Sequence, residues 1–325
     1  MTTPRCMLAL ASTLLALSTP ASAQDLFTAP DPSKPTRVEV GLYILDLVKI
    51  DGAAQAMSVD FVVTAQWKDP RLAGRPRKVS LDEIWDPELA VLHERKTWKK
   101  FKDIAHVDAE GNVLYRQRYW GELSVPLRLD DFPLDDHIID VTLVATALEP
   151  VEMVVRAEVT GIAAKLSIPD WSIRMEGSHV GIWKPAETRP FGTVTLEFHA
   201  KRHVSFFLWK IVLPMALIVF MSWAVFWVDP VNVGPQISLA VTSMLTLMAY
   251  RVVIGKFLPN LPYLTRMDLF VVGGTLLVFM ALIQEVATTY LAKRGNEELP
   301  RRIDRWSRWA FPLAFVGIFF AAFAL

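Results

Sequence analysis

The segment LRLDDFPLDDHIID, residues 127–140, contains five aspartates, four of which lie within three residues of a Phe-Pro pair. Carboxylates at this density can pair with a cation on another segment, or they can form an ordinary solvated turn. The stretches on either side of Phe132 and Pro133 suit strands, so we predict a tight turn between two of them. The residue types alone favour the solvated turn.

A second set of polar side chains lies in GPQISLAVTSMLTLMAYRVVIGK, residues 234–256. The hydroxyls there could line a water path that a leucine closes by dewetting. They could equally well join helices by hydrogen bonds. A water path with one lining helix per chain also requires a ring of subunits. Steps of four and three residues place on one helical face Ser238, Thr242, Leu245, Ala249, Val252 and Lys256.

Other chemistry is not indicated. The exported part has no Gly-rich phosphate loop, no histidines at metal-ligand spacing and no nucleophile elbow. We therefore expect no enzyme, no cofactor and no metal site. The formal net charge is zero, so nothing points to nucleic acid as a partner. Proton sensing stays open, because histidine titrates near neutral pH, at His93, His137, His179, His199 and His203.

The N-terminal segment, residues 1–23, has the features of a secretion signal rather than a lasting membrane anchor. Arg5 precedes an apolar stretch, and Ala21-Ser22-Ala23 is typical of a cleavage site. The only cysteine, Cys6, lies inside this segment, so we expect the mature protein to contain no disulfide.

Residues 24–203 are predicted to form an exported, all-β immunoglobulin-like sandwich. The evidence is a series of runs that alternate apolar and polar residues, broken by Pro, Gly and Asp. Only SLDEIWDPELA suggests a short helix or turn. One run, VEVGLYILDLVKI, is predicted to place on a common face Val38, Val40, Leu42, Ile44, Val48 and Ile50.

Residues 204–325 are predicted to form an all-α membrane domain. Each apolar segment reaches the ~20 residues that a spanning helix needs. The basic connector 291–306 is expected in the cytoplasm by the positive-inside rule, and three crossings from an exported domain lead to the same side. We therefore predict a bacterial inner-membrane protein with both the sandwich and the C-terminus in the periplasm. The four spans are predicted at about 204–228, 236–255, 266–290 and 307–325.

Taken together, these features resemble a pentameric ligand-gated ion channel of the prokaryotic branch of the Cys-loop receptor superfamily. QWKDPRL is similar to the family's W-x-D-x-R-L strand, and IWDPEL is similar to its W-x-P-D segment. The loop around Phe132-Pro133 and Asp135 is similar to the family's signature loop. The two cysteine positions of that loop fall on Val125 and Ile139, where apolar packing would replace the disulfide.

The resemblance implies a homopentamer in a lipid bilayer that conducts inorganic ions when a small molecule or a proton acts as agonist. The second span would line the pore, and the signature loop would transmit the agonist signal to the membrane half. Arg202, directly before the first span, would be the cation for an acidic loop residue. The implied coupling residues are Phe132, Pro133, Asp135, Arg202, Pro259, Pro262 and Tyr263.

The predicted pore entry leaves the ion selectivity open. GPQISL resembles the cation-channel entry in length, whereas Pro235 stands in place of the family's selectivity glutamate and Gln236 in place of its basic residue. The length favours cations, and the charge does not. An anion channel is the alternative.

The implied agonist pocket departs further from the family pattern. An amine receptor holds an ammonium group in an aromatic box, and only the hairpin GIWKPAETRPFG offers aromatic residues here. The pocket positions fall on Leu92 with its neighbour His93, Thr146, Trp183, Phe191 and Val62.

Three other kinds of protein fit these features less well than a channel does. A membrane-anchored sensor that does not conduct would need only one or two featureless spans. A tethered enzyme lacks a catalytic motif, and a transporter would show an internal repeat or paired broken helices.

Overall fold

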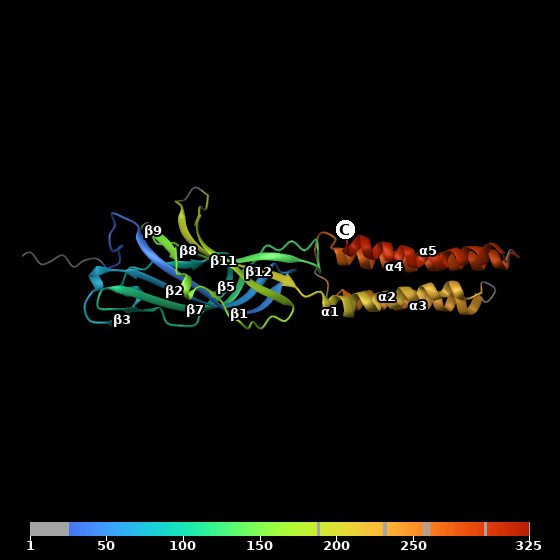
Figure 1. Ribbon diagram of the computed structural model, residues 1–325, viewed down its shortest axis with the longest axis horizontal. Coiled ribbons are helices and arrows are strands. Elements are labelled where there is room, and N and C mark those ends of the chain that lie inside the picture. Colours follow the sequence, from blue (N-terminus) through green and yellow to red (C-terminus); the bar gives the residue numbers. More distant parts are fainter. Residues whose placement is uncertain are drawn as a thin grey trace, which may run out of the picture.

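The chain folds as a β-sandwich followed by a bundle of helices (Figure 1). The computed structural model describes residues 26–186, 189–229, 233–255, 258, 261–295 and 298–324. The predicted signal segment, Lys256 and Pro259 lie outside these residues. The strands end where the first helix begins, so the two folds meet at one junction, and the C-terminal helix ends near it (Figure 1).

The larger sheet has the order β10-β1-β2-β7-β6-β3, with β9 also paired to β1 and β5 to β7. Its strands are β1 (Thr36–Asp51), β2 (Ala56–Lys68), β3 (Arg77–Ser80), β5 (Glu94–Lys99), β6 (Ile104–Val107), β7 (Asn112–Ser124), β9 (Val151–Val155) and β10 (Gly161–Ile162). The smaller sheet, in the order β11-β12-β8-β4, consists of β4 (Leu89–Val91), β8 (Asp136–Ala145), β11 (Trp171–Trp183) and β12 (Phe191–Arg202).

The sandwich core combines the inward faces of both sheets. Phe61 and Leu42 come from the larger sheet and Phe198 and Ile139 from the smaller one, and all four are almost fully buried. Val125 is buried in the same core, so apolar side chains occupy both positions at which the resemblance implied a disulfide.

One predicted strand face is wrong at a single position, Val48, while Ile50 beyond it is buried as predicted. Val48 is 46% exposed, while its neighbour Leu47 is fully buried. The cause is a pair of register shifts in β1, between Ile44 and Asp46 and between Leu47 and Lys49. The first shift reverses which side chains face the core, and the second restores the original face at Ile50. Three short 3-10 turns also occur in the sandwich, at η1 (Pro70–Leu72), η2 (Leu81–Glu83) and η3 (Ala157–Val159), of which only η2 lies in the segment expected to contain a helix or turn.

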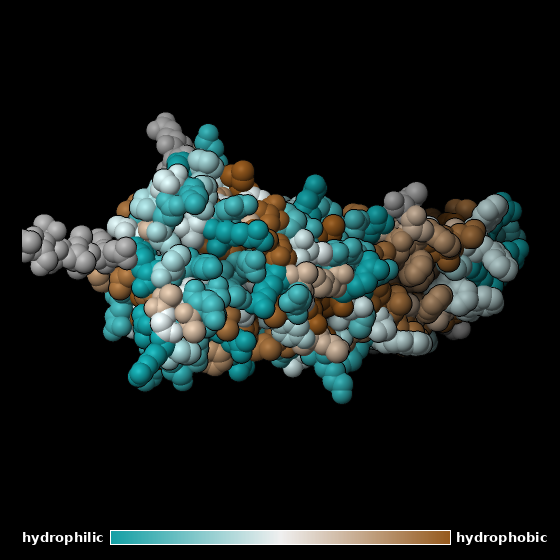
Figure 2. All heavy atoms as spheres, turned by 60° about the vertical axis from the view of Figure 1, so that its left-hand side comes forward, coloured by the Kyte–Doolittle hydropathy of each residue, from teal (hydrophilic) through white to brown (hydrophobic). Residues whose placement is uncertain are grey.

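Four helical segments of the described chain are long and apolar enough to cross a membrane. The first, Ser205–Trp227, consists of α1 (Ser205–Phe207), a π-helical turn η4 (Leu208–Val212), α2 (Leu213–Ala224) and η5 (Val225–Trp227). The others are α3 (Val233–Ile254), α4 (Arg266–Lys293) and α5 (Glu298–Phe323). Figure 2 shows the contrast between the largely hydrophilic sandwich and the hydrophobic middle of the bundle.

A proline explains the π-helical turn in the first span. Pro214 has no N–H group, so the carbonyl group of Lys210 loses its normal partner in the helix. The hydroxyl group of Tyr250, from α3, lies near this break and donates to the carbonyl oxygen of Ile211 at 2.7 Å and to that of Lys210 at 3.3 Å. The irregular turn is thereby tied to α3 at its end nearest the sandwich.

Candidate functional site

The signature loop between β7 and β8 is organised around the guanidinium group of Arg202. This group donates to the carboxylate of Asp135 through Nε at 2.7 Å and through a second nitrogen at 2.8 Å. It also lies over the ring of Trp171, at 4.1 Å from the ring centroid, and over that of Phe132, at 5.0 Å. The bidentate pair and the two rings fix the loop to the end of β12, directly before the first membrane helix.

The Asp135 carboxyl group is ionised although it is buried. Burial by itself would raise its pKa, but hydrogen bonds from His137 and Arg202 outweigh that effect and hold the pKa below its usual value. The His137 ring nitrogen lies 3.2 Å from the second carboxylate oxygen. A buried anion that is satisfied in this way is a rigid anchor rather than a solvated turn residue.

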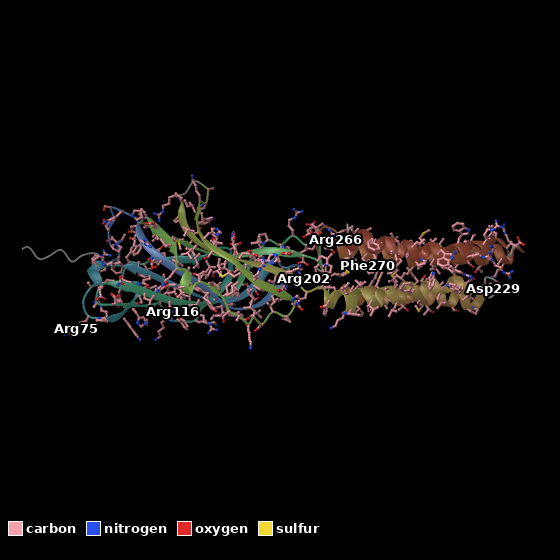
Figure 3. The ribbon with its side chains drawn as sticks, in the orientation of Figure 1. Arg75, Arg116, Arg202, Asp229, Arg266 and Phe270 are labelled. Atoms are coloured by element: carbon pink, nitrogen blue, oxygen red, sulfur yellow. The ribbon has the colours of Figure 1, made fainter. Side chains whose placement is uncertain are left out.

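The loop also contacts the N-terminus of α4. The backbone N–H groups of Arg266 and Met267 donate to the carbonyl oxygens of Asp130 and Phe132, at 3.0 and 3.1 Å. The first N–H groups of a helix have no partner within the helix, so loop carbonyls are suitable acceptors. The Arg266 side chain adds an ion pair with Asp131 at 2.6 Å. Figure 3 shows Arg202 and Arg266 on the two sides of this junction.

The helix end that receives the loop is fixed by its own cap. The Thr265 hydroxyl accepts from the backbone N–H of Asp268, and the Asp268 carboxylate accepts from the backbone N–H of Thr265. This reciprocal capping box determines where α4 begins. The hydroxyl of Tyr263, two residues earlier, accepts from the backbone N–H of Leu129 at 3.1 Å.

A cavity of about 560 Å³ lies at the same junction. Its wall includes the turn between β1 and β2, the loop residues Leu129 and Phe132, and the beginning of the first membrane helix. Phe207 of that helix packs edge-to-face on Phe132, with the ring centroids 4.9 Å apart. The loop therefore contacts the first span and α4 at once, and a shift of the loop must displace or strain both.

The structure brings together most of the coupling residues expected from the sequence. Phe132, Pro133, Asp135 and Arg202 are buried or nearly so in one cluster, and Tyr263 bonds to the loop. Pro262 is exposed, and Pro259 lies outside the described residues. Other parts of this junction were not predicted from the sequence, namely Arg266, Phe207, Trp171 and the turn between β1 and β2. Only the T-R-M-D capping pattern at residues 265–268 could have indicated that a helix begins next to the loop.

The polar stripe of α3 lies on the side of the helix that faces away from the bundle. Ser238, Thr242, Leu245, Ala249 and Val252 are exposed, and Lys256 lies outside the described residues. The buried face of α3 consists of Gln236, Ala240, Ser243, Leu247 and Ile254. At 3.6 residues per turn these two sets lie on opposite sides of the helix. The Thr242 hydroxyl donates to the carbonyl oxygen of Ser238 at 2.7 Å, so in this chain it does not join α3 to another helix.

The two residues expected at the pore entry differ in exposure. Pro235 is exposed, whereas Gln236 is fully buried and faces the bundle. Among the described residues, the exposed stripe of α3 carries hydroxyl and apolar groups and no carboxylate.

The hairpin between β11 and β12 contains the predicted aromatic pair together with an arginine. The rings of Trp183 and Phe191 lie 6.0 Å apart. The guanidinium of Arg189 lies over the Phe191 ring, at 5.0 Å from its centroid, and donates to the carbonyl oxygens of Ala147 and Leu148. An internal cation thus already lies on one of the two rings, that of Phe191, with which an amine could interact.

The other predicted pocket positions lie at different places. Thr146 is adjacent to the carbonyl groups bound by Arg189, and its own hydroxyl donates to the Glu88 carbonyl oxygen at 2.7 Å. Leu92 and His93 line a separate shallow cavity of about 370 Å³. Val62 lies on β2, where it pairs with Arg118 of β7. One chain therefore does not assemble these residues into one closed pocket.

Two of the histidines pair with acids of the signature loop. His137 pairs with Asp135, as described above, and His199 lies 2.5 Å from Asp136. His203 contacts the carbonyl oxygen of Pro169 at 3.1 Å. Within the described part of the chain, no group of three or more histidine, cysteine or acidic side chains could hold a metal ion.

Comparisons with known proteins agree with this architecture. Residues 24–186 match the model of the neurotransmitter-gated ion-channel ligand binding domain, and residues 211–302 match that of the neurotransmitter-gated ion-channel transmembrane region. A proton-gated ion channel from Gloeobacter violaceus is 26% identical over 319 residues, which cover 93% of this chain and 87% of that relative.

Proposed function

Because the chain belongs to the neurotransmitter-gated ion-channel family, we propose that it is a homopentameric ligand-gated channel whose pore is lined by α3. One observation carries the proposal. The hydroxyl and apolar stripe of α3 is exposed, while the opposite face of the helix is packed against its own bundle. A pentameric ring would turn these stripes toward a common axis. Leu245, 65% exposed in the single chain, would be the hydrophobic constriction.

We propose that gating passes through the signature loop. An agonist would change the arrangement of the two sheets, and the loop contacts both the first span and the N-terminus of α4. Tyr250 links the irregular turn of the first span to α3, so a displacement at the junction can reach the pore helix. This is a mechanical route through packed, hydrogen-bonded contacts.

Protons are the first candidate agonist. The Gloeobacter relative is a proton-gated ion channel, and His137 and His199 of this chain pair with acidic residues of the loop that contacts the membrane half. Protonation of His199 would strengthen its attraction to Asp136. A small molecule bound at the hairpin of Trp183 and Phe191 is the second candidate, and it would have to accommodate Arg189.

The proposed permeant ions are inorganic cations, because the pore entry has the length of a cation-channel entry. The absence of a carboxylate from the exposed stripe of the described residues argues for weak selectivity. An anion-selective pore is the alternative, and reversal potentials in asymmetric salt distinguish the two. We place the protein in the bacterial inner membrane, with the sandwich and the C-terminus in the periplasm.

The proposal is tested by reconstituting the purified protein in bilayers and recording current while pH and candidate agonists are varied. Leu245→Ser should ease opening or slow closure, because a hydroxyl weakens dewetting at the constriction. The matched control is Leu269→Ser, because Leu269 is an exposed leucine outside the stripe. Leu247 is unsuitable, because it is buried and its replacement would disturb the packing of the bundle. A protein that forms no pentamer and passes no current at any pH or with any agonist would instead be a membrane-anchored sensor.

A further inference from the structure

Buried polar atoms without hydrogen-bond partners are concentrated in one part of the helix bundle. Among the described residues, seven buried side-chain nitrogen or oxygen atoms lack a partner. Six of them belong to Gln236, Glu285, Thr289 and Asp304, and the seventh is the indole nitrogen of Trp67 in the sandwich. The four bundle residues come from α3, α4 and α5, at the end farther from the sandwich, where Asp229 is labelled in Figure 3. Such a concentration requires an explanation, because buried polar groups are nearly always paired.

These residues are buried within one subunit. Gln236 and Glu285 are fully buried, and Asp304 is 1% exposed. Neighbouring subunits or lipid can only cover them further, so their burial does not depend on how subunits assemble.

Glu285 faces another acid and has no ion-pair partner in the described chain. Asp304 of α5 interacts with it electrostatically. The Gln236 side chain of α3 is close enough to act on it, although the two groups do not meet hydrogen-bond geometry. Gln284, Thr288 and Thr289 are the polar neighbours on α4 itself. An ionised carboxylate that is buried without an ion-pair partner is costly, whereas the neutral acid can be satisfied by hydrogen bonds alone.

The charged groups nearest to Asp304 are already engaged. Arg308, one turn further along α5, donates to the carbonyl oxygen of Phe226 at 2.9 Å and lies over the Trp227 ring at 4.6 Å. Asp229, which also acts on Asp304 electrostatically, lies 3.5 Å from Arg301. Asp304 accepts one hydrogen bond, from the Gln284 amide at 3.2 Å. The cations present therefore leave Glu285 uncompensated.

A single proton would satisfy all four partnerless atoms of Gln236 and Glu285. A carboxylic acid offers one O–H donor and one carbonyl acceptor, and a carboxamide offers N–H donors and one carbonyl acceptor. The two groups are complementary and can form a pair of hydrogen bonds. An ionised carboxylate could accept from the Gln236 amide nitrogen but would leave the amide oxygen of Gln236 without a donor.

We propose that Glu285 is a proton-binding site inside the helix bundle, and that its proton joins α4 to the buried face of α3 through Gln236. Loss of the proton places an unpaired charge between α3, α4 and α5. This charge weakens the packing of α3 against α4 at the end of the bundle farther from the sandwich. The site is separate from the histidines of the sandwich, and under the proposed topology it lies toward the cytoplasm.

Infrared spectroscopy of the purified full-length protein tests the site without requiring channel activity. The wild type at neutral pH should show the C=O stretch of a buried protonated carboxyl group. Glu285→Gln, which preserves the size and the amide pairing, should remove that band. Glu298→Gln, a change to an exposed acid at the start of α5, should leave it unchanged. Gln236→Leu should shift the band, because the acid loses its hydrogen-bond partner.

Two results would overturn the proposal. One is a band that survives Glu285→Gln but disappears in Asp304→Asn, which would place the proton on Asp304. The other is a thermal unfolding temperature that rises with added sodium or calcium in the wild type but not in Glu285→Gln, which would mean that a metal cation occupies the site. We expect instead that alkaline pH lowers the unfolding temperature of the wild type and that this loss is absent from Glu285→Gln. Because no readout is a current, failure here leaves the proposed channel function untouched.

Discussion

At the scale of single residues, Arg202 and Asp135 determine how the sandwich is joined to the membrane helices. Their bidentate ion pair is almost completely buried, with side-chain exposures of 10% and 1%. Trp171 and Phe132 lie over the guanidinium group and limit its exposure to solvent. Removing one member of a buried pair is costly chiefly because the other charge is left without a partner.

Asp135→Asn is therefore expected to destabilise the protein by about 3–5 kcal/mol. The Arg202 charge would remain buried and could keep only neutral hydrogen bonds. Thermal unfolding of the purified protein measures the effect. Asp130→Asn is the matched control from the same loop, since Asp130 is exposed and lies 3.3 Å from the exposed Arg128. A surface change of this kind should stay within about 0.5 kcal/mol.

The same pair predicts a dependence of stability on acid pH. The pKa of Asp135 is lower in the folded chain than its usual value, so the ionised form stabilises the fold. This contribution is complete above about pH 5, where an unfolded aspartate is almost fully ionised. It is lost as the pH falls through the lowered pKa of the folded state. The unfolding temperature of Asp135→Asn should therefore fall less than that of the wild type as the pH is lowered through this range. An identical acid-side loss in wild type and variant would show that other carboxylates are responsible.

At the scale of secondary structure elements, the contact between the loop and α4 joins the two halves of the chain. Two backbone hydrogen bonds and the ion pair of Asp131 with Arg266 make this contact. The Asp131 side chain is 61% exposed, and exposed pairs contribute only about 0–1 kcal/mol to stability. The pair can nevertheless matter for gating, because small energies at a two-state junction shift populations.

Reversing the charges of this pair separates the two roles. Asp131→Arg and Arg266→Asp should each change the pH or agonist concentration for half-maximal opening, with little change in thermal stability. The double variant should restore the wild-type value, since opposite charges face each other again. Additive effects in the double variant would show that the two side chains do not interact during gating.

The sequence predicted the order and type of elements better than their details. Period-two alternation identified the sandwich, and apolar length identified four helices long enough to span a membrane. The bulges of β1 were not predictable, because a register shift depends on pairing with β2 and not on the strand alone. α5 begins at Glu298, earlier than the predicted span at 307, because its first turns are helical without being apolar.

The candidate site was predicted only in part, because contacts between distant segments leave no local signal in the sequence. The loop motif led to Phe132, Pro133, Asp135 and Arg202, which share one cluster. Arg266 carries no local signal of its role, since its partner is distant in the sequence. Gln236 was assigned to the pore entry from its position in a motif, whereas the structure places it on the buried face of α3. Which side of a helix is buried depends on how its neighbours pack.

At the scale of the whole molecule, the central claim is that five copies of α3 line a water-filled pore. The claim can be tested with introduced cysteines. The only natural cysteine, Cys6, lies in the segment expected to be removed, so an introduced cysteine would be the single thiol of the mature protein. Thr242 and Ser243 are adjacent hydroxyl residues of α3, one exposed on the stripe and the other fully buried against the bundle. Replacing each in turn by cysteine creates two variants that differ by one position.

The decisive measurement is the current through each reconstituted variant before and after a charged, water-soluble thiol reagent is added during opening. We predict that the Thr242→Cys channel is blocked or strongly altered, because its thiol faces the ion path, and that the Ser243→Cys channel is unaffected. Equal insensitivity of both variants, or modification of Ser243→Cys alone, would contradict a pore lined by this face of α3.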